Sequence, residues 1–269
     1  MRRGDWNGIS RAALIQVGSV RLGSDGPMKF TVAKHSRDWF YRWMLEKSGH
    51  PGQNLFLSNL FNVVGGFLYS FKFQVRVTSD GAIPATGPVL ILSKHCSLAD
   101  VPLGKIAVMK DSRRHLWCVM KDSLGKGPFG WFLLRQGGIP INRQNPEKSK
   151  HDLLLARNVL RADHALCVFP EQTIVPGKMG RGKLPGFRFI TAKSSRPIPV
   201  LCIGFRYTKR RMRRTLVEIK IGSPRDFQPN DDPTMFLHER MQEIARLSGL
   251  TYPHPPAKEV PETADAAEA

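Results

Sequence analysis

The pattern of short apolar runs most constrains the fold of this chain. Strands that alternate with helices are typical of a mostly parallel sheet flanked by helices. One intervening helix is well marked, because Asn145, Pro146 and Glu147 supply a cap, a proline at the first position and an early acid. The sequence therefore predicts a mixed, mostly parallel α/β domain over residues 73–254. The apolar runs, which are the expected strands, lie at residues 73–78, 88–93, 116–120, 165–169, 198–205 and 216–221.

Two amphipathic helices are expected ahead of the first strand, in residues 28–72. Residues 37–47 place Trp39, Phe40, Trp43 and Met44 on one helical face beside basic side chains, which suits a membrane interface. Residues 53–71 carry no charge and repeat apolar side chains at helical spacing, but three Asn and two Gly favour a helix lying in the interface over a membrane span. From the sequence, packing of this helix on the protein's own core is an equal alternative.

The two ends of the chain differ from its middle. Residues 1–27 are basic and lack the apolar core and cleavage site of a secretory signal. We interpret them as an extension upstream of a native start at Met28, a hypothesis that N-terminal sequencing of the native protein tests. Residues 255–269 are rich in Pro, Ala and Glu without an apolar period, which predicts a disordered acidic tail.

Charge limits the classes of binding partner that this chain is expected to have, and cysteine content indicates the redox state of its compartment. The 41 Lys and Arg against 22 Asp and Glu give a net charge of +19, which favours nucleic acid, an anionic membrane surface or a phosphorylated substrate. No recognised nucleic-acid-binding motif is present, so specific nucleic acid binding is not expected. The four cysteines show neither metal-ligand spacing nor a disulfide pattern, which fits a reducing cytoplasm.

A histidine and an aspartate follow the second predicted strand, at the end where α/β sheets build their sites. Asp100 comes five positions after His95, so within one regular helix the two would lie about 140° apart. They can meet only if His95 lies in the turn before the helix. Asp100 would then fix the imidazole tautomer, and the other ring nitrogen could remove a proton from a hydroxyl. The spacing alone is weak evidence, because a loop histidine and a helix-start acid give the same pattern.

Further blocks follow this pair in a fixed order. With His95 and Asp100, they resemble the four blocks of the glycerolipid and lysophospholipid acyltransferase family, over roughly residues 88–200. The resemblance implies an α/β acyltransferase with His95 as general base and Asp100 as its partner. His95 and Asp100 form the first block. The second block consists of Lys121, Pro128, Gly130, Gly138, Ile139, Ile141 and Arg143, the third of Phe169, Pro170, Glu171 and Thr173, and the fourth of Pro197, Ile198 and Pro199.

The resemblance also implies an acceptor site for a phosphate group. Gln172 stands where the family has glycine, and Ile174 where it has arginine, so the head group of the acceptor is open. We hypothesise that the missing cation comes from the glycine-rich loop 176–183, with Arg181 as the first choice beside Lys178 and Lys183. Glu171 either hydrogen-bonds the acceptor or organises the neighbouring basic groups. The residues expected to bind substrate are Lys121, Asn142, Arg143, Glu171, Gln172, Thr173 and Arg181.

The expected reaction is transfer of a fatty acyl chain from acyl-CoA or acyl carrier protein to a lysophospholipid hydroxyl, with lysophosphatidic acid giving phosphatidic acid as the leading case. A lyso-aminolipid acceptor is one alternative, and a non-catalytic basic lipid-binding membrane protein is another. An acyl-cysteine route through Cys96 is disfavoured, because adjacent side chains usually point apart. No metal or bound cofactor is implied.

The expected location is the cytoplasmic face of the cell membrane, with peripheral or monotopic attachment. The basic run at residues 209–214 lies between two predicted strands and is interpreted as a hairpin or loop tip. It is either a solvated loop or a surface for anionic lipid head groups or an acidic acyl carrier protein.

Overall fold

The computed structural model describes residues 34–142 and 145–257, and the predicted extension over residues 1–27 lies outside this part of the chain. Of the predicted tail over residues 255–269, the part from residue 258 onward also lies outside it, whereas residues 255–257 are described and Ala257 packs against the core, contrary to the prediction. The helices are α1 (Lys34–Ser48), α2 (Leu55–Lys72), α3 (Asp100–Ser112), α4 (Gly127–Arg135), α5 (Pro146–Arg161), α6 (Leu184–Thr191) and α7 (Pro233–Ser248). The strands are β1 (Phe73–Ser79), β2 (Val89–Ser93), β3 (Leu116–Lys121), β4 (Gly138–Ile141), β5 (Ala165–Val168), β6 (Ile198–Arg210), β7 (Arg213–Ile221) and β8 (Arg225–Phe227).

The strands form one mixed, mostly parallel sheet, as predicted. Their order is β1-β7-β6-β2-β5-β3-β4, and β8 pairs with β6. Strands β6, β2, β5, β3 and β4 are parallel, whereas β7 and β8 are antiparallel to β6 and β1 is parallel to β7. Every predicted run is a strand, but β4 and β8 were not predicted: β4 is four residues with a glycine and a proline, and β8 is three residues of which two are charged, so neither forms an apolar run.

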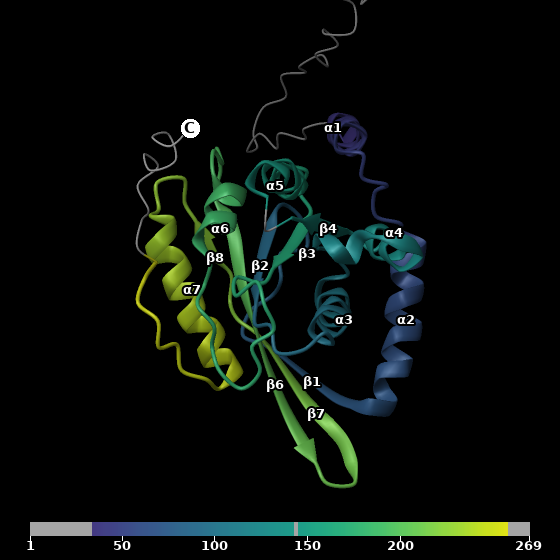
Figure 1. Cartoon of the computed structure of the whole chain (residues 1–269), viewed down its shortest axis with the longest axis vertical. Helices are drawn as coiled ribbons and strands as arrows, with labels where there is room; N and C mark the ends of the chain where they lie inside the picture. Colours follow the sequence, from purple (N-terminus) through teal and green to yellow (C-terminus); the bar gives the residue numbers. More distant parts are fainter. Residues whose placement is uncertain (1–33, 143–144, 258–269) are drawn as a thin grey trace, which may run out of the picture. The chain divides into compact units, whose positions relative to one another are not determined.

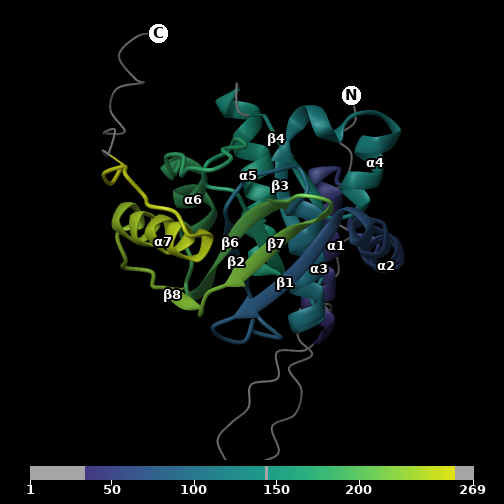
Figure 2. The ribbon, with the colours of Figure 1, turned by 90° about the horizontal axis from the view of Figure 1, so that it is seen from below.

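Helices cover both faces of this sheet (Figures 1 and 2). In β2, Leu90 and Leu92 pack in a core that contains side chains of α5, α6 and α7, whereas Val89 and Ile91 pack in a second core with side chains of α3. A strand buried on both faces reads as a continuous apolar run, which is why β2 was easy to predict. Each such side chain contributes about 1.5–3 kcal/mol on burial.

Helix α1 uses one side to pack and leaves the other exposed. Met44 is buried in the core beside Tyr41, whose ring lies 6.3 Å from that of Trp117. Trp39 and Trp43 are exposed and stack on each other with ring centroids 6.3 Å apart. The prediction that Met44 shares the interfacial face of the tryptophans is therefore wrong, because its side chain fills the core instead.

Helix α2 buries two small residues and leaves most of its apolar side chains exposed. It begins after Asn54, whose side chain caps the amide of Leu57, and its buried residues are Ser58 and Gly65. Phe67 is 64% exposed and Phe71 is 67% exposed. Packing of the apolar stripe on the protein's own core, the alternative that the sequence left open, is therefore wrong. None of the helices in the described part of the chain is long and apolar enough to cross a bilayer.

Candidate active site

The predicted site residues gather where parallel strands end. Strands β2, β5, β3 and β4 are neighbours in this order, so their carboxyl ends share one edge of the sheet. His95 follows β2, Glu171 follows β5, Lys121 ends β3, and Asn142 follows β4. In open α/β sheets this edge is where ligands bind.

The histidine and the aspartate meet in the way that their spacing required. Asp100 is the first residue of α3, and His95 lies in the turn before it. The Nδ1 atom of His95 is 3.2 Å from Oδ2 of Asp100. Asp100 is buried, whereas the His95 side chain is 16% exposed. With Nδ1 directed at the carboxylate, Nε2 is the ring atom that can accept a proton from a substrate.

Asp100 is held by three donors besides the histidine. Its Oδ2 accepts from the backbone amides of Cys96 at 2.5 Å and Ser97 at 2.7 Å. Its Oδ1 accepts from the hydroxyl of Tyr207 at 2.6 Å. Burial and the negative charge of Asp100 raise the pKa of Tyr207, so this phenol stays protonated and donates. The carboxylate is therefore fixed in place by α3, its preceding turn and β6.

We expect Tyr207→Phe to lower kcat by about 10- to 100-fold, because a hydrogen bond to a charged group contributes about 1.5–3 kcal/mol. Phenylalanine keeps the ring contacts of Tyr207 with Phe73 and Phe205, so the fold should be retained. The measurement is steady-state kinetics with both substrates varied. An unchanged kcat would show that the amides of Cys96 and Ser97 are sufficient to hold the carboxylate.

A buried ion pair lies directly behind the histidine. The Nζ atom of Lys94 is 2.8 and 2.7 Å from the two carboxylate oxygens of Glu171, and neither side chain is exposed by more than 1%. The same carboxylate accepts from the backbone amides of His95 at 3.1 Å and Gly180 at 2.5 Å. Glu171 therefore has the organising role that the sequence offered as an alternative, and both its oxygens are engaged within the protein.

The loop after β5 is joined to the histidine turn at several points. The amide of Val175 donates to the carbonyl of His95 at 2.8 Å, and Nζ of Lys94 donates to the carbonyl of Val175 at 2.7 Å. The ring of Phe169 lies 4.3 Å from the imidazole of His95, measured between centroids. These contacts fix the backbone and the ring of His95 together.

The remaining predicted acceptor residues are more dispersed. Lys121, Thr173 and Arg181 are exposed, and Arg181 lies in the loop that Glu171 anchors through the amide of Gly180. Asn142 is partly buried after β4, and Arg143 lies outside the described residues. The structure therefore brings Thr173 and Arg181 into the loop that contacts the His95 turn, and it leaves Lys121 and Asn142 farther along the sheet edge.

Gln172 adopts a backbone conformation that explains the glycine found at this position in the resemblance. Its φ is +57°, in the left-handed region that favours glycine. Its amide donates to the carbonyl of Phe169 at 3.0 Å, which closes the turn after β5. Glutamine is accommodated in this turn and adds a side chain, whose amide nitrogen lies beside Gly186.

Two residues of the site, Lys94 and Tyr207, were missed in the sequence. Lys94 is a charged residue placed at the end of an apolar strand, where a cation needs a buried partner, so its position was a usable signal. Tyr207 lies in β6 more than a hundred positions from Asp100, and nothing local indicates the contact. In the described residues, no group of three or more His, Cys, Asp or Glu side chains could hold a metal ion.

The chain resembles known acyltransferases in its sequence and in its fold. The family model described as Acyltransferase matches residues 74–206. The fold is similar to the crystal structure of the 1-acyl-sn-glycerophosphate (LPA) acyltransferase, PlsC, from Thermotoga maritima, with a TM-score of 0.53 and 19% sequence identity over 77% of this chain and 87% of that one. No curated protein sequence matches the chain.

Proposed function

Because this chain belongs to the glycerolipid acyltransferase family, we propose that it transfers a fatty acyl chain from acyl-CoA or acyl carrier protein to the hydroxyl of a lysophospholipid. The observation that carries the proposal is the contact of His95 with a buried Asp100 at the carboxyl edge of the sheet. Lysophosphatidic acid, which would give phosphatidic acid, is the first acceptor to test.

In the proposed mechanism the lipid hydroxyl attacks the thioester directly. Nε2 of His95 accepts the hydroxyl proton as the oxygen forms a bond to the carbonyl carbon. The tetrahedral intermediate then releases the carrier thiolate, which takes the proton back from the imidazolium. Asp100 remains ionised throughout and stabilises the imidazolium through Nδ1, as in other histidine-carboxylate pairs. No metal or bound cofactor takes part in this proposal.

The environment of Cys96 supports direct attack over an acyl-cysteine intermediate. Burial and the nearby charge of Asp100 raise the pKa of this thiol to about 12. Its Sγ atom lies 3.6 Å from the carbonyl oxygen of Phe205, directed into the protein. Since the thiolate is the nucleophilic form, Cys96 is a poor nucleophile near neutral pH.

We propose that Arg181 binds the acceptor phosphate, because it is exposed in the loop that the Glu171 carboxylate anchors beside His95. Arg181→Ala should then raise KM for a phosphorylated lysolipid by about 10- to 100-fold, the value of one charge-assisted hydrogen bond, while kcat stays near wild type. Lys178→Ala and Lys183→Ala are matched controls that remove the other two cations of the loop. If Arg181→Ala left KM unchanged and one of the controls raised it, the lysine removed in that control would be the residue that binds the phosphate.

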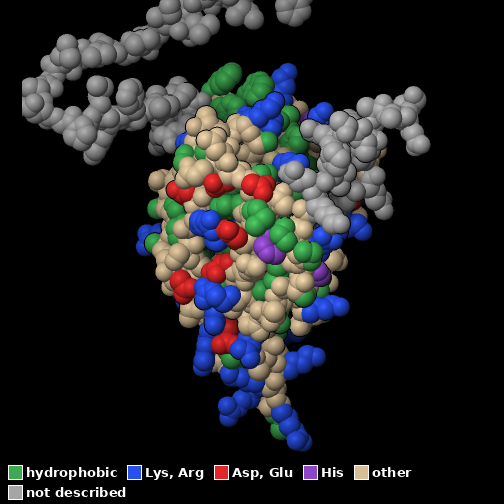
Figure 3. All heavy atoms as spheres, turned by 90° about the vertical axis from the view of Figure 1, so that its left-hand side faces the viewer, with side chains coloured by type: hydrophobic (Ala, Val, Ile, Leu, Met, Phe, Trp, Pro, Cys, Tyr) green, Lys and Arg blue, Asp and Glu red, His purple; other side chains and the backbone are tan. Residues whose placement is uncertain are grey.

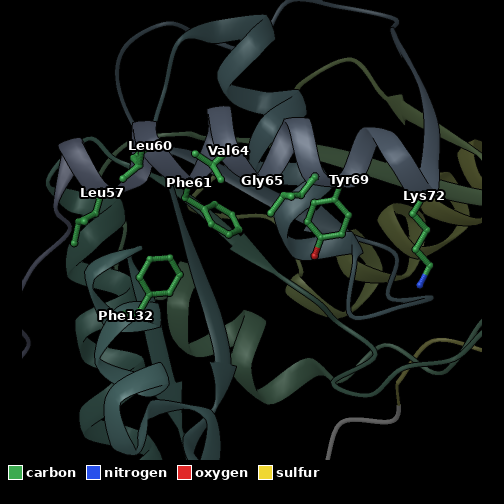
Figure 4. Close-up of a pocket in the computed structure, with 9 residues that line it drawn as sticks. Leu57, Leu60, Phe61, Val64, Gly65, Tyr69, Lys72 and Phe132 are labelled. Atoms are coloured by element: carbon green, nitrogen blue, oxygen red, sulfur yellow. The ribbon is translucent and has the colours of Figure 1, made fainter.

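The exposed face of α2 supports attachment to a membrane surface. Between α2 and α4 lies an apolar groove of about 530 Å³, lined by Phe61, Val64 and Phe132 among others and open along α2 (Figure 4). At one end, the ring of Tyr69 stacks on Phe73, and Phe73 in turn contacts Tyr207 of the site. We propose that acyl chains reach the His95 site along this face, with the enzyme peripheral or monotopic on the cytoplasmic side of the cell membrane.

The test is transfer of a labelled acyl chain from acyl-CoA and from acyl carrier protein to a panel of lysolipids in micelles. The panel includes lysophosphatidic acid, other lysophospholipids and a lyso-aminolipid, and His95→Ala serves as the inactive reference. Labelled product with wild type alone supports the proposal and identifies the acceptor. Lipid binding without transfer to any acceptor would favour a non-catalytic lipid-binding protein instead.

A further inference from the structure

The β6–β7 hairpin projects beyond the rest of the sheet and ends in a basic tip. We use "hairpin tip" for residues 209–214, which are Lys209, Arg210, Arg211, Met212, Arg213 and Arg214. Figure 1 shows the projection, and Figure 3 shows Lys and Arg side chains gathered around it. Met212 is 96% exposed at the turn, with a φ of +56°. The hairpin tip thus presents one apolar side chain surrounded by cations.

The hairpin tip lies beside the end of α2. Strand β7 pairs with β1 in parallel, so that Phe73, the first residue after α2, is opposite Thr215. A guanidinium nitrogen of Arg214 donates to the carbonyl of Ser70 at 2.7 Å, and one of Arg210 donates to Gln74 at 2.9 Å. The exposed Phe67 and Phe71 occupy the same end of α2. An apolar helix face and a basic hairpin therefore form one continuous surface.

In the part of the chain that the structure describes, the cations of this surface have no acidic partner. Within the described residues, no member of the hairpin tip takes part in an ion pair, and Lys209, Arg211 and Arg213 have no side-chain hydrogen bond. The nearest acid in β7 is Glu218, four residues after Arg214 and in register with Arg76 and Arg206. The charge of the hairpin tip is therefore available to an external anion.

We propose that the hairpin tip is a second membrane contact, which binds anionic phospholipid head groups while the apolar face of α2 enters the interface. The proposal rests on the membrane attachment put forward above and specifies its lipid. Apolar side chains flanked by cations are typical of surfaces that bind anionic bilayers. Each Lys or Arg near such a surface strengthens binding about fivefold. An acidic carrier protein is the rival partner, but it would not account for the exposed Met212 or for the continuity with α2.

The test is cosedimentation of the full chain with vesicles of neutral phosphatidylcholine, alone or mixed with phosphatidylglycerol, at low salt. The variant K209Q/R211Q/R213Q removes the three cations of the hairpin tip whose side chains form no hydrogen bond or ion pair within the described residues. We expect it to bind mixed vesicles about a hundredfold more weakly than wild type and neutral vesicles equally well. The matched control K110Q/K150Q/K193Q removes three exposed lysines from α3, α5 and the segment after α6, and should lose far less. Met212→Asn, which tolerates the same positive φ, should lose a few-fold on both kinds of vesicle.

The outcomes separate this proposal from the proposed enzyme activity. Transfer measured in detergent micelles with acyl-CoA should be unchanged in K209Q/R211Q/R213Q, since no anionic bilayer is present. Equal losses in the hairpin and control variants would overturn the proposal, because net charge alone would then explain binding. It would also be overturned if the hairpin variant bound mixed vesicles normally but lost activity only with acyl carrier protein, an outcome that assigns the tip to the carrier.

Discussion

Replacing His95 with alanine should lower kcat for acyl transfer by about a hundred- to ten-thousand-fold, the usual contribution of a positioned general base. The reason is that Nε2 of this ring accepts the hydroxyl proton in the proposed mechanism, while Nδ1 is held by Asp100. The measurement is single-turnover transfer to the acceptor that the panel identifies. KM values should change little, because the imidazole acts on the transition state more than on bound substrate.

The substitution should leave the site otherwise intact. Glu171 holds this turn through the backbone amide of His95, which alanine retains, and Val175 donates to the backbone carbonyl. Cys96→Ser is the matched control at the next position. Because burial holds the thiol pKa near 12, serine should keep activity within a few-fold of wild type. If His95→Ala retained activity and Cys96→Ser lost it, a covalent route through the cysteine would replace general-base attack.

The sheet could be predicted from the sequence because its central strands are buried on both faces. Such strands read as apolar runs, as β2 does over Val89–Ser93. The parts of β6 and β7 nearest the hairpin tip are different. Beyond Phe205, β6 carries Arg206, Lys209 and Arg210, and it pairs with β7 by backbone hydrogen bonds without an apolar period. Their length was therefore underestimated, and with it the reach of the hairpin tip.

The site could be predicted only where its residues are close in the sequence. The H-x4-D spacing, combined with strand-end placement, identified His95 and Asp100 and required the turn that the structure contains. The hydrogen bond from Tyr207 to Asp100 joins β6 to the first residue of α3, and a single sequence carries no sign of such a pairing. The role of Glu171 was left open for the same reason, because its cation partner is Lys94, 77 positions earlier.

Gln172 shows how a departure from a motif can be structural in origin. The sequence suggests that replacing glycine alters acceptor recognition, whereas the φ of +57° shows that this position first determines the turn after β5. A non-glycine residue in this region costs about 1–2 kcal/mol. The glutamine at this position therefore bears directly on the backbone conformation of the site. It bears only indirectly on which acceptor head group is bound.

Breaking the Lys94–Glu171 pair should be the most destabilising change in the site. Lys94→Met leaves a buried carboxylate without its cation, which typically costs about 3–5 kcal/mol in the free energy of unfolding. Glu171→Leu leaves the buried ammonium instead and should cost a similar amount. The measurement is denaturant-induced unfolding of each variant. A loss below about 1 kcal/mol in both would mean that water enters the pair and relieves its burial.

The double variant K94M/E171L separates stability from activity. Replacing a buried ion pair by apolar residues is often neutral or stabilising, so the double variant should recover part of the stability that each single variant loses. Recovery will be incomplete, because the amides of His95 and Gly180 lose their acceptor. For the same reason kcat should remain low: without the carboxylate, the turn of His95 keeps the hydrogen bond from the amide of Val175 but loses its link through Glu171 to the part of the loop that carries Arg181. If kcat recovered together with stability, Glu171 would be a structural residue with no part in positioning His95.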